Sequence, residues 1–403
     1  MLNSNLRLSS DGTQLRGVHF KDIKSINIPD TVTVICNGAF EDCCNLEYID
    51  IPSSVTTISS AAFKGCTSLK ILDLPSSIII IGSAAFSECE SLQNVDIPDS
   101  VRVIESAAFS NCTSLQNIII PNSVDQIGKA VFYGCTSLKS ITLSNSIKSL
   151  EDQLFYGCNS LEGIELPKSI NTIGNSVFNQ CEALKRIEIP DSVKMIGFQA
   201  FSLCISLESI EIPISVICID EGAFDGCHSL KGISIKGHIN KIGKCTFSDC
   251  YSLKSISLPI SLIAISDYAF SSCKSLQKLD IPNSVTEIGK NAFNGCSALQ
   301  SISIPNTVNT IMHGSFAKCT DLESISLPNS LTKIESYAFA GCNKLSKIKL
   351  NNKNPKKIDV SDVAFEGLYD NVILVIPAGS RWEYRHHPVF KLFSKIDINH
   401  QDQ

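Results

Sequence analysis

The sequence repeats itself every 23 residues, and this period constrains the fold more than any other feature. Phenylalanine recurs at positions 40, 63, 86, 109, 132, 155, 178, 201, 224, 247, 270, 293, 316 and 339, without one insertion. A cysteine follows each phenylalanine by three residues and a leucine by six. Two of these sets are Phe63, Cys66, Leu69 and Phe178, Cys181, Leu184. A fixed period of this length is typical of proteins built from stacked coils, so we expect these residues to be structural.

The repeat reads A-F-x-x-C-x-x-L-x-x-I-x-I-P-x-S-V-x-x-I-G-x-x. Its L-x-x-I-x-I part alternates apolar and outward residues and predicts a short strand, which the following proline ends. We expect 49–51 to pair with 72–74, and 72–74 with 95–97. The segment around A-F-x-x-C predicts a short helical or 3-10 turn. Glycines at the phase of Gly82 are expected to adopt backbone angles that other residues avoid.

A period of 20 to 29 residues with L-x-x-L-x-L character is typical of leucine-rich repeats. The sequence therefore predicts a β-rich α/β solenoid, a right-handed superhelix with one parallel sheet on its concave face. We expect an N-terminal cap and half-repeat at residues 1–29, the solenoid at 30–350, and an atypical last repeat with a C-terminal cap at 351–403. The C-terminal segment carries the only tryptophan, Trp382, which is expected to help cover the last coil, with His386 and His387 exposed beside it.

The cysteines of the repeat allow three interpretations. Side chains at one phase of stacked coils lie about 4.8 Å apart and point the same way, whereas a disulfide requires Cβ atoms near ~3.8 Å that face each other. Zinc sites need clustered cysteine and histidine, but these thiols are 23 residues apart and the histidines share no phase with them. We favour the third interpretation, in which each thiol is a small buried apolar group whose S–H meets a backbone carbonyl.

Composition excludes several classes of function. The chain has 403 residues, of which 43% are hydrophobic, and a formal net charge of −6. A nucleic-acid-binding protein is not expected, because it would need a strongly basic face. No apolar run is long enough to span a membrane. No Ser-His-Asp, phosphate-loop or zinc-protease motif is present, so we expect no catalytic residues, no metal and no cofactor.

The unit "IPxSVxxIGxxAFxxCxxLxxI" resembles the BspA-like leucine-rich repeats, and the C-terminal "VIPAGSRWEY" resembles that family's cap. The resemblance extends from about residue 15 to residue 398. It implies a bacterial cell-surface or secreted protein with a role in adhesion, and a partner such as a host matrix or surface protein. The N-terminal "MLNSNLRLSSDG" lacks the apolar segment of a secretory signal, so a cytoplasmic location is the alternative. The oligomeric state is left open.

Function is expected at the outward positions of the strands, because the inward positions build the core. Between the last two apolar residues of the strand stand Asp50, Asp73, Asp96 and, later, Glu165, Glu188 and Glu211. Two positions earlier stand Tyr48, Ile71 and Arg186. Like charges side by side in a sheet are destabilising. We interpret this acidic strip as a site for a basic partner or Ca²⁺; the alternative is a solvated face, eased by lysines such as Lys70.

The sequence leaves three functions open. The first is a non-enzymatic protein that binds a macromolecular partner through its extended sheet. The second is a surface that binds or processes glycans, since paired carboxylates can act as acid and nucleophile. An enzyme, however, needs carboxylates in different environments, and the uninterrupted period offers equal environments on an open surface. The third is a structural spacer, which would show no preference at the outward positions.

Overall fold

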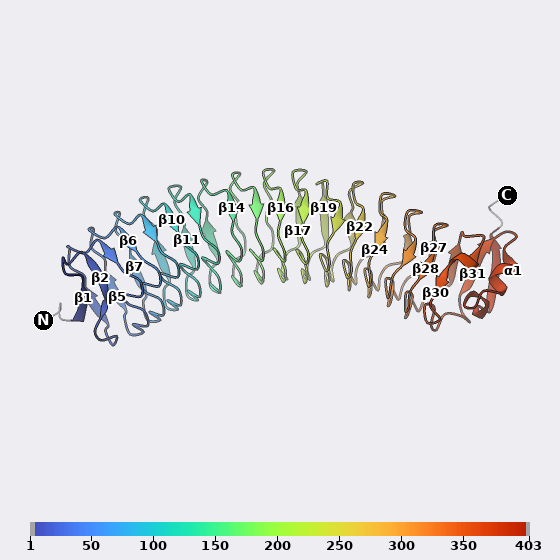
Figure 1. Cartoon of the computed structure of the whole chain (residues 1–403), viewed down its shortest axis with the longest axis horizontal. Helices are drawn as coiled ribbons and strands as arrows, with labels where there is room; N and C mark the ends of the chain where they lie inside the picture. Colours follow the sequence, from blue (N-terminus) through green and yellow to red (C-terminus); the bar gives the residue numbers. More distant parts are fainter. Residues whose placement is uncertain (1–4, 400–403) are drawn as a thin grey trace. The chain divides into compact units, whose positions relative to one another are not determined.

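The computed structural model describes residues 5–399, and its fold is a parallel-strand β-solenoid with almost no helix. The chain divides into two compact units, one ending at Leu207 and the other beginning at Glu208. Within each unit, successive repeats form successive coils (Figure 1). The cap boundaries at 29/30 and 350/351 stay a prediction.

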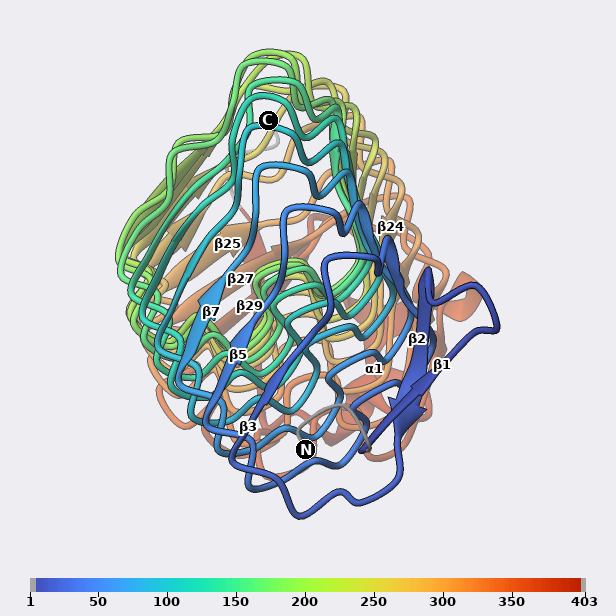
Figure 2. The ribbon, with the colours of Figure 1, turned by 90° about the vertical axis from the view of Figure 1, so that its left-hand side faces the viewer.

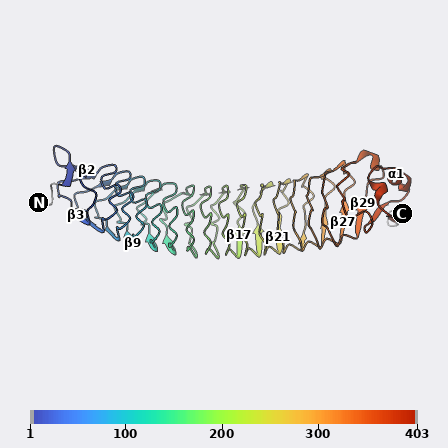
Figure 3. The same ribbon diagram turned by 90° about the horizontal axis from the view of Figure 1, so that it is seen from below.

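The predicted strand is present and pairs in parallel with the same strand of the next coil. Ile49 is the Cα partner of Leu72, and Leu72 is the partner of Val95, so the predicted register is confirmed. In the first unit these strands are β3 (Ser25–Asn27), β5 (Tyr48–Asp50), β7 (Ile71–Asp73), β9 (Asn94–Asp96), β11 (Asn117–Ile119) and β13 (Ser140–Thr142). In the second unit they are β17 (Ser209–Ile212), β19 (Gly232–Ile235), β21 (Ser255–Ser257), β23 (Lys278–Leu279), β25 (Ser301–Ser303), β27 (Ser324–Leu327) and β29 (Lys347–Leu350). Figure 3 shows β17 and β21 along one side of the second unit.

A second parallel ladder, which the repeat pattern does not predict, runs along another side of the coils. It uses the two residues before the Gly82 phase, so that Thr57 pairs with Ile80 and Ile58 with Ile81. In the first unit its strands are β4 (Val34–Ile35), β6 (Thr57–Ile58), β8 (Ile80–Ile81), β10 (Val103–Ile104), β12 (Gln126–Ile127), β14 (Ser149–Leu150), β15 (Thr172–Ile173) and β16 (Met195–Ile196). In the second unit they are β18 (Cys218–Ile219), β20 (Lys241–Ile242), β22 (Ala264–Ile265), β24 (Glu287–Ile288), β26 (Thr310–Ile311), β28 (Lys333–Ile334) and β30 (Asp359–Val360).

The segment around A-F-x-x-C is a series of turns closed by hydrogen bonds that span three residues, the spacing of the expected 3-10 turn; the N–H of Cys66, for example, donates to the carbonyl of Phe63 at 3.2 Å. These turns do not extend into a helix anywhere in residues 30–350. Ala61 adopts φ 55°, a left-handed angle that a helix does not contain. The N–H of Ala61 donates to the carbonyl of Ser83 at 2.8 Å, and that of Phe63 donates to Ala85 at 2.7 Å. The turn therefore bonds to the next coil, and these bonds offset the strain of the left-handed angle.

The glycines at the phase of Gly82 lie close against the backbone of the preceding coil, and the expected unusual backbone angle is wrong. Gly82 is not among the residues with positive φ. A Cβ on Gly82 would lie 2.6 Å from the carbonyl carbon of Ser59 and 2.8 Å from the carbonyl oxygen of Ile58. Glycine permits this close approach between the backbones of successive coils.

The core is a column of phenylalanine rings with a column of thiols beside it. Phe63 is fully buried, and its ring centroid lies 5.0 Å from that of Phe40 and 5.2 Å from that of Phe86. Cys66 is also fully buried, and its Sγ donates to the carbonyl of Phe40 at 3.2 Å. Leu69, Phe178, Cys181 and Leu184 are likewise at 0% exposure. The ladder cysteines are free thiols in the structure.

We predict that the ladder thiols of the native protein react slowly with a thiol reagent. Burial raises the pKa of the Cys89 thiol to about 12, and the thiolate is the reactive form. Cys44 and Cys218 are exposed and should react first. Titration in denaturant should then reveal the remaining thiols. Rapid reaction of all the thiols in the native protein, or disulfides between successive ladder positions, would contradict this interpretation.

The N-terminal end of the first unit is covered by an antiparallel hairpin. It consists of β1 (Leu6–Leu8) and β2 (Gln14–Val18). Gly12 adopts φ 71° in the connecting turn, where Asp11-Gly12 predicts such a turn. In Figure 2 this hairpin lies on one side of the coils and β3, β5 and β7 lie on another.

The C-terminal cap contains β31 (Ile373–Pro377), α1 (Arg381–Arg385), β32 (Lys395–Asn399) and two 3-10 segments, Pro355–Lys357 and Phe390–Leu392. The rings that cover the last coil are Tyr384, Phe390 and Phe393, all at 0% exposure. Trp382 does not share this role: it is 61% exposed and stacks on His386 with centroids 4.2 Å apart. His386 is exposed as expected, but His387 is buried.

Candidate functional site

The outward side chains of β5, β7 and β9 form one open face of the first unit. In each strand the middle residue is buried and its two neighbours are exposed, because successive side chains of a strand point to opposite sides. The parallel register then places equivalent outward residues of successive coils side by side. This face carries five residues selected from the sequence: Tyr48, Asp50, Ile71, Asp73 and Asp96.

Three of these residues form an acidic row. Asp50 is the Cα partner of Asp73, and Asp73 is the partner of Asp96, so the three residues stand on adjacent strands about 4.8 Å apart. Lys70 was expected to reduce the repulsion between these carboxylates. It pairs with Glu47 instead, with its Nζ 3.8 Å from Oε2. No ion pair within residues 5–399 involves any of the three aspartates. Their charges are therefore uncompensated by direct pairing in the described chain.

Exposed apolar side chains border the acidic row. Tyr48 and Ile71 are register partners and are 45% and 57% exposed. On β11, Ile119 is the partner of Asp96 and is 66% exposed. Exposed apolar groups grouped beside charges are typical of surfaces that contact another protein. We call these six residues, Tyr48, Asp50, Ile71, Asp73, Asp96 and Ile119, the acidic face.

The remaining residues selected from the sequence are not part of this face. Glu165, Arg186 and Glu188 are exposed, but their segments are not strands in the structure. Glu211 lies on β17 in the second unit and pairs with Lys236, whose Nζ is 2.6 Å from Oε1. The structure thus brings the three aspartates together, whereas it gives Glu211 a basic partner within its own unit.

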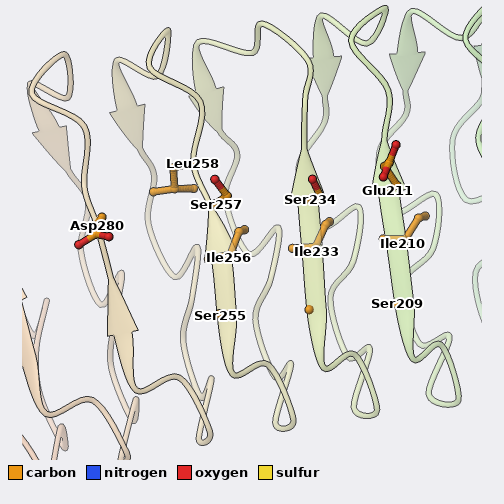
Figure 4. Close-up of a pocket in the computed structure, with 11 residues that line it drawn as sticks. Ser209, Ile210, Glu211, Ile233, Ser234, Ser255, Ile256, Ser257, Leu258 and Asp280 are labelled. Atoms are coloured by element: carbon orange, nitrogen blue, oxygen red, sulfur yellow. The ribbon is translucent and has the colours of Figure 1, made fainter.

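A second feature of the sheet, in the second unit, is not predicted by the sequence pattern. The outward residues of β17, β19 and β21 form a depression of about 700 Å³ (Figure 4). Its lining includes small residues, namely Ser209, Gly232, Ser234, Ser255 and Ser257. Glu211 and Asp280 lie at its opposite ends. The signal for it in the sequence is the run of serine and glycine at two outward phases, where β5, β7 and β9 carry larger side chains.

Calcium at the acidic strip finds no support in the described residues. Within 5–399, no three side chains of histidine, cysteine, aspartate or glutamate come close enough together to hold a metal ion. Within the same residues, no helix is long and apolar enough to cross a membrane. The exposed side chains of the acidic face offer charge, hydrogen bonding and apolar contact to a partner.

Comparison with known proteins identifies the family. The model of the BspA type leucine rich repeat region matches residues 18–139, 104–231 and 240–371. A solved leucine-rich repeat protein from Bacteroides ovatus is similar with a TM-score of 0.81 and 31% identity, over 92% of this chain and 97% of that one. A leucine rich cell surface protein from Faecalibacterium prausnitzii has a TM-score of 0.54 and 27% identity, over 87% and 94% of the two chains.

More distant structures share the fold alone. The pneumococcal vaccine antigen PcpA is 19% identical, with a TM-score of 0.53, over 99% of this chain and 98% of that one. A search of curated proteins found no match. The family model covers most of the repeats seen in the structure, and the chain belongs to the family of proteins with BspA-type leucine-rich repeats.

Proposed function

We propose that the chain is a non-enzymatic binding protein that holds a basic segment of another protein on the acidic face. The observation that carries this proposal is the in-register row of Asp50, Asp73 and Asp96 without an ion-pair partner in the described chain. A stable fold gains nothing from like charges at this spacing. A partner that brings lysine or arginine side chains removes the repulsion and adds attraction.

The apolar side chains give the proposed partner a second requirement. Tyr48, Ile71 and Ile119 lose their exposed area when covered, and this contributes about 25 cal/mol per Å². Tyrosine is also enriched among residues that dominate protein interfaces. The partner is therefore expected to combine basic and apolar residues. The F. prausnitzii relative is described as a cell surface protein, and we propose a surface or secreted location for this chain, with matrix or surface proteins as partners.

Reversing the charges of the acidic row should abolish binding while leaving the fold intact. The variant replaces Asp50, Asp73 and Asp96 by lysine; Lys349 already occupies this phase in another coil. Its affinity for a partner captured from a panel of extracellular matrix proteins should fall by at least about tenfold, which is about 1.4 kcal/mol. Binding of the unmodified chain should weaken with salt, because exposed charges are screened within about 10 Å at about 0.1 M.

The matched control changes the net charge equally at other places of the first unit. Asp30, Asp99 and Asp125 are exposed and lie outside the strands of the acidic face. Their replacement by lysine should leave the affinity within about twofold. Calcium should have no effect on capture. Equal loss in both triple variants, or unchanged affinity in the first, would contradict the proposal.

A further inference from the structure

A small hollow lies at the turns of three successive coils in the second unit, away from the strands of the sheet. Its volume is about 320 Å³, at the lower end of the ~300–1,000 Å³ typical of small-molecule sites. It is lined by Asn291, Asn294, His313, Lys318 and Tyr337 and by four small residues, Gly314, Ala317, Ala340 and Gly341, which we call its floor. Figure 1 places these coils between β24 and β30.

Small residues at fixed phases leave room for the hollow. Ala317 and Ala340 directly follow a core phenylalanine, at the phase where Tyr133 and Tyr156 stand in the first unit. Gly314 lies between Asn291 and Tyr337 at the phase two residues before the core phenylalanine. A Cβ on Gly314 would come within 2.3 Å of the Oδ1 of Asn291, so a side chain there would displace the Asn291 amide.

The floor is held rigidly by backbone bonds between coils. The N–H of Gly314 donates to Ser336 at 3.1 Å, and that of Lys318 donates to Ala340 at 2.7 Å. Asn291 is only 8% exposed, and its Oδ1 accepts a hydrogen bond from the Nδ2 of Asn294 at 2.9 Å. A site with fixed walls binds a small ligand without losing conformational entropy of its own.

The two amides offer one free donor and one free acceptor. Within residues 5–399, the Nδ2 of Asn291 and the Oδ1 of Asn294 have no hydrogen-bond partner. This pair complements the C=O and N–H of a secondary amide. The alanine floor suits a methyl group. Beside the amides, the Tyr337 ring is 43% exposed and meets the His313 ring at 84°, with centroids 5.7 Å apart.

We propose that this hollow binds an N-acetylated sugar. The acetamido group fits the two asparagines, with its methyl on Ala317 and Ala340, and the apolar face of the sugar ring lies on Tyr337. Lys318 is exposed at the rim and donates to sugar oxygens. A peptide amide shares the hydrogen-bonding pattern, but an extended chain has two ends to accommodate, whereas the acetamido group terminates at its methyl.

The experiment measures binding of methyl N-acetylglucosaminide to the full chain by saturation-transfer NMR and calorimetry. Methyl glucoside and N-acetylalanine methylamide are the comparison probes. We expect a millimolar dissociation constant for the acetylated sugar, as befits a ligand of this size, and no saturable binding of the other two. Tyr337→Ala should weaken binding by at least about tenfold. Alanine occupies this phase with the same left-handed angle at Ala61, so the variant should fold.

Matched variants separate loss of the site from loss of the fold. Ala340→Tyr fills the hollow with a residue that this phase accepts at Tyr133, and it should abolish binding; Ala340→Ser should preserve it. Tyr268→Ala alters a tyrosine of the same phase that does not line the hollow, and it should bind normally. Absent binding of the acetylated sugar, equal binding of either comparison probe, or equal loss in Tyr268→Ala would overturn the proposal.

Discussion

Replacing Phe178 by alanine should lower the free energy of unfolding of the first unit by about 3–5 kcal/mol. The ring is fully buried between Phe155 and Phe201, with centroid distances of 5.5 Å and 5.2 Å. Removing it deletes two stacked contacts and leaves a cavity that neighbouring coils, fixed by their backbone ladders, cannot close. Urea unfolding followed by circular dichroism measures the loss.

The damage should also be local, because each coil contacts only its neighbours. Hydrogen exchange should accelerate first in residues 155–201 and later towards Leu6. Phe198→Ala is the matched control: this phenylalanine belongs to the same coil but is 44% exposed, and its loss should cost less than about 1 kcal/mol. A uniform rise in exchange over the unit, or similar losses in both variants, would contradict the picture of stacked coils.

Alkaline pH should destabilise the protein steeply. Burial raises the pKa of the ladder thiols, with Cys89, Cys135 and Cys296 each at about 12 in the folded chain against an ordinary 9.0. Because the folded state holds its thiol protons more tightly, the stability from this source is complete below pH 9.0 and is lost as pH rises towards about 12. Within that window, each buried thiol lowers the free energy of unfolding by about 1.4 kcal/mol per pH unit.

Several thiols titrate together when a unit unfolds, so the effects add. We expect the melting temperature to fall by more than about 10 °C between pH 8 and pH 10. Calorimetry at a series of pH values measures this. A variant with Cys89, Cys112 and Cys135 replaced by alanine should be less stable at neutral pH but should show a flatter dependence above pH 9. If the melting temperature falls equally steeply with pH in both proteins, groups other than these thiols control alkaline unfolding.

The sequence predicted the first ladder correctly because its period has no insertion. A constant interval of 23 residues forces equivalent residues of neighbouring coils into register, so the pairing of Asp50 with Asp73 follows from counting. The second ladder was missed because its strands, such as Thr57–Ile58, contain two residues. Two residues show no alternation, and backbone pairing between coils is what makes them strands.

Other features depend on neighbours that no single repeat reveals. The sequence suggested that position 82 needs glycine for its backbone angle. The structure shows instead that a Cβ at this position would approach the backbone of the preceding coil too closely. The large side chain of Trp382 was expected to cover the last coil. Trp382 is exposed, and Tyr384, two residues later, is the buried ring at this place. The hollow beside Tyr337 combines small residues from two coils with two asparagines from a third. Such a site is visible only when the coils are stacked.

The most direct test of the binding proposal is carboxyl labelling of the chain with a carbodiimide and an amine, with and without a captured partner. Mass spectrometry then reports the labelling of each aspartate. Bound partner should reduce labelling of Asp50, Asp73 and Asp96 and leave Asp30, Asp99 and Asp125, which are also open to solvent in the free chain, unchanged. Unchanged labelling of the acidic row in the complex, with protection elsewhere, would show that the partner binds another surface.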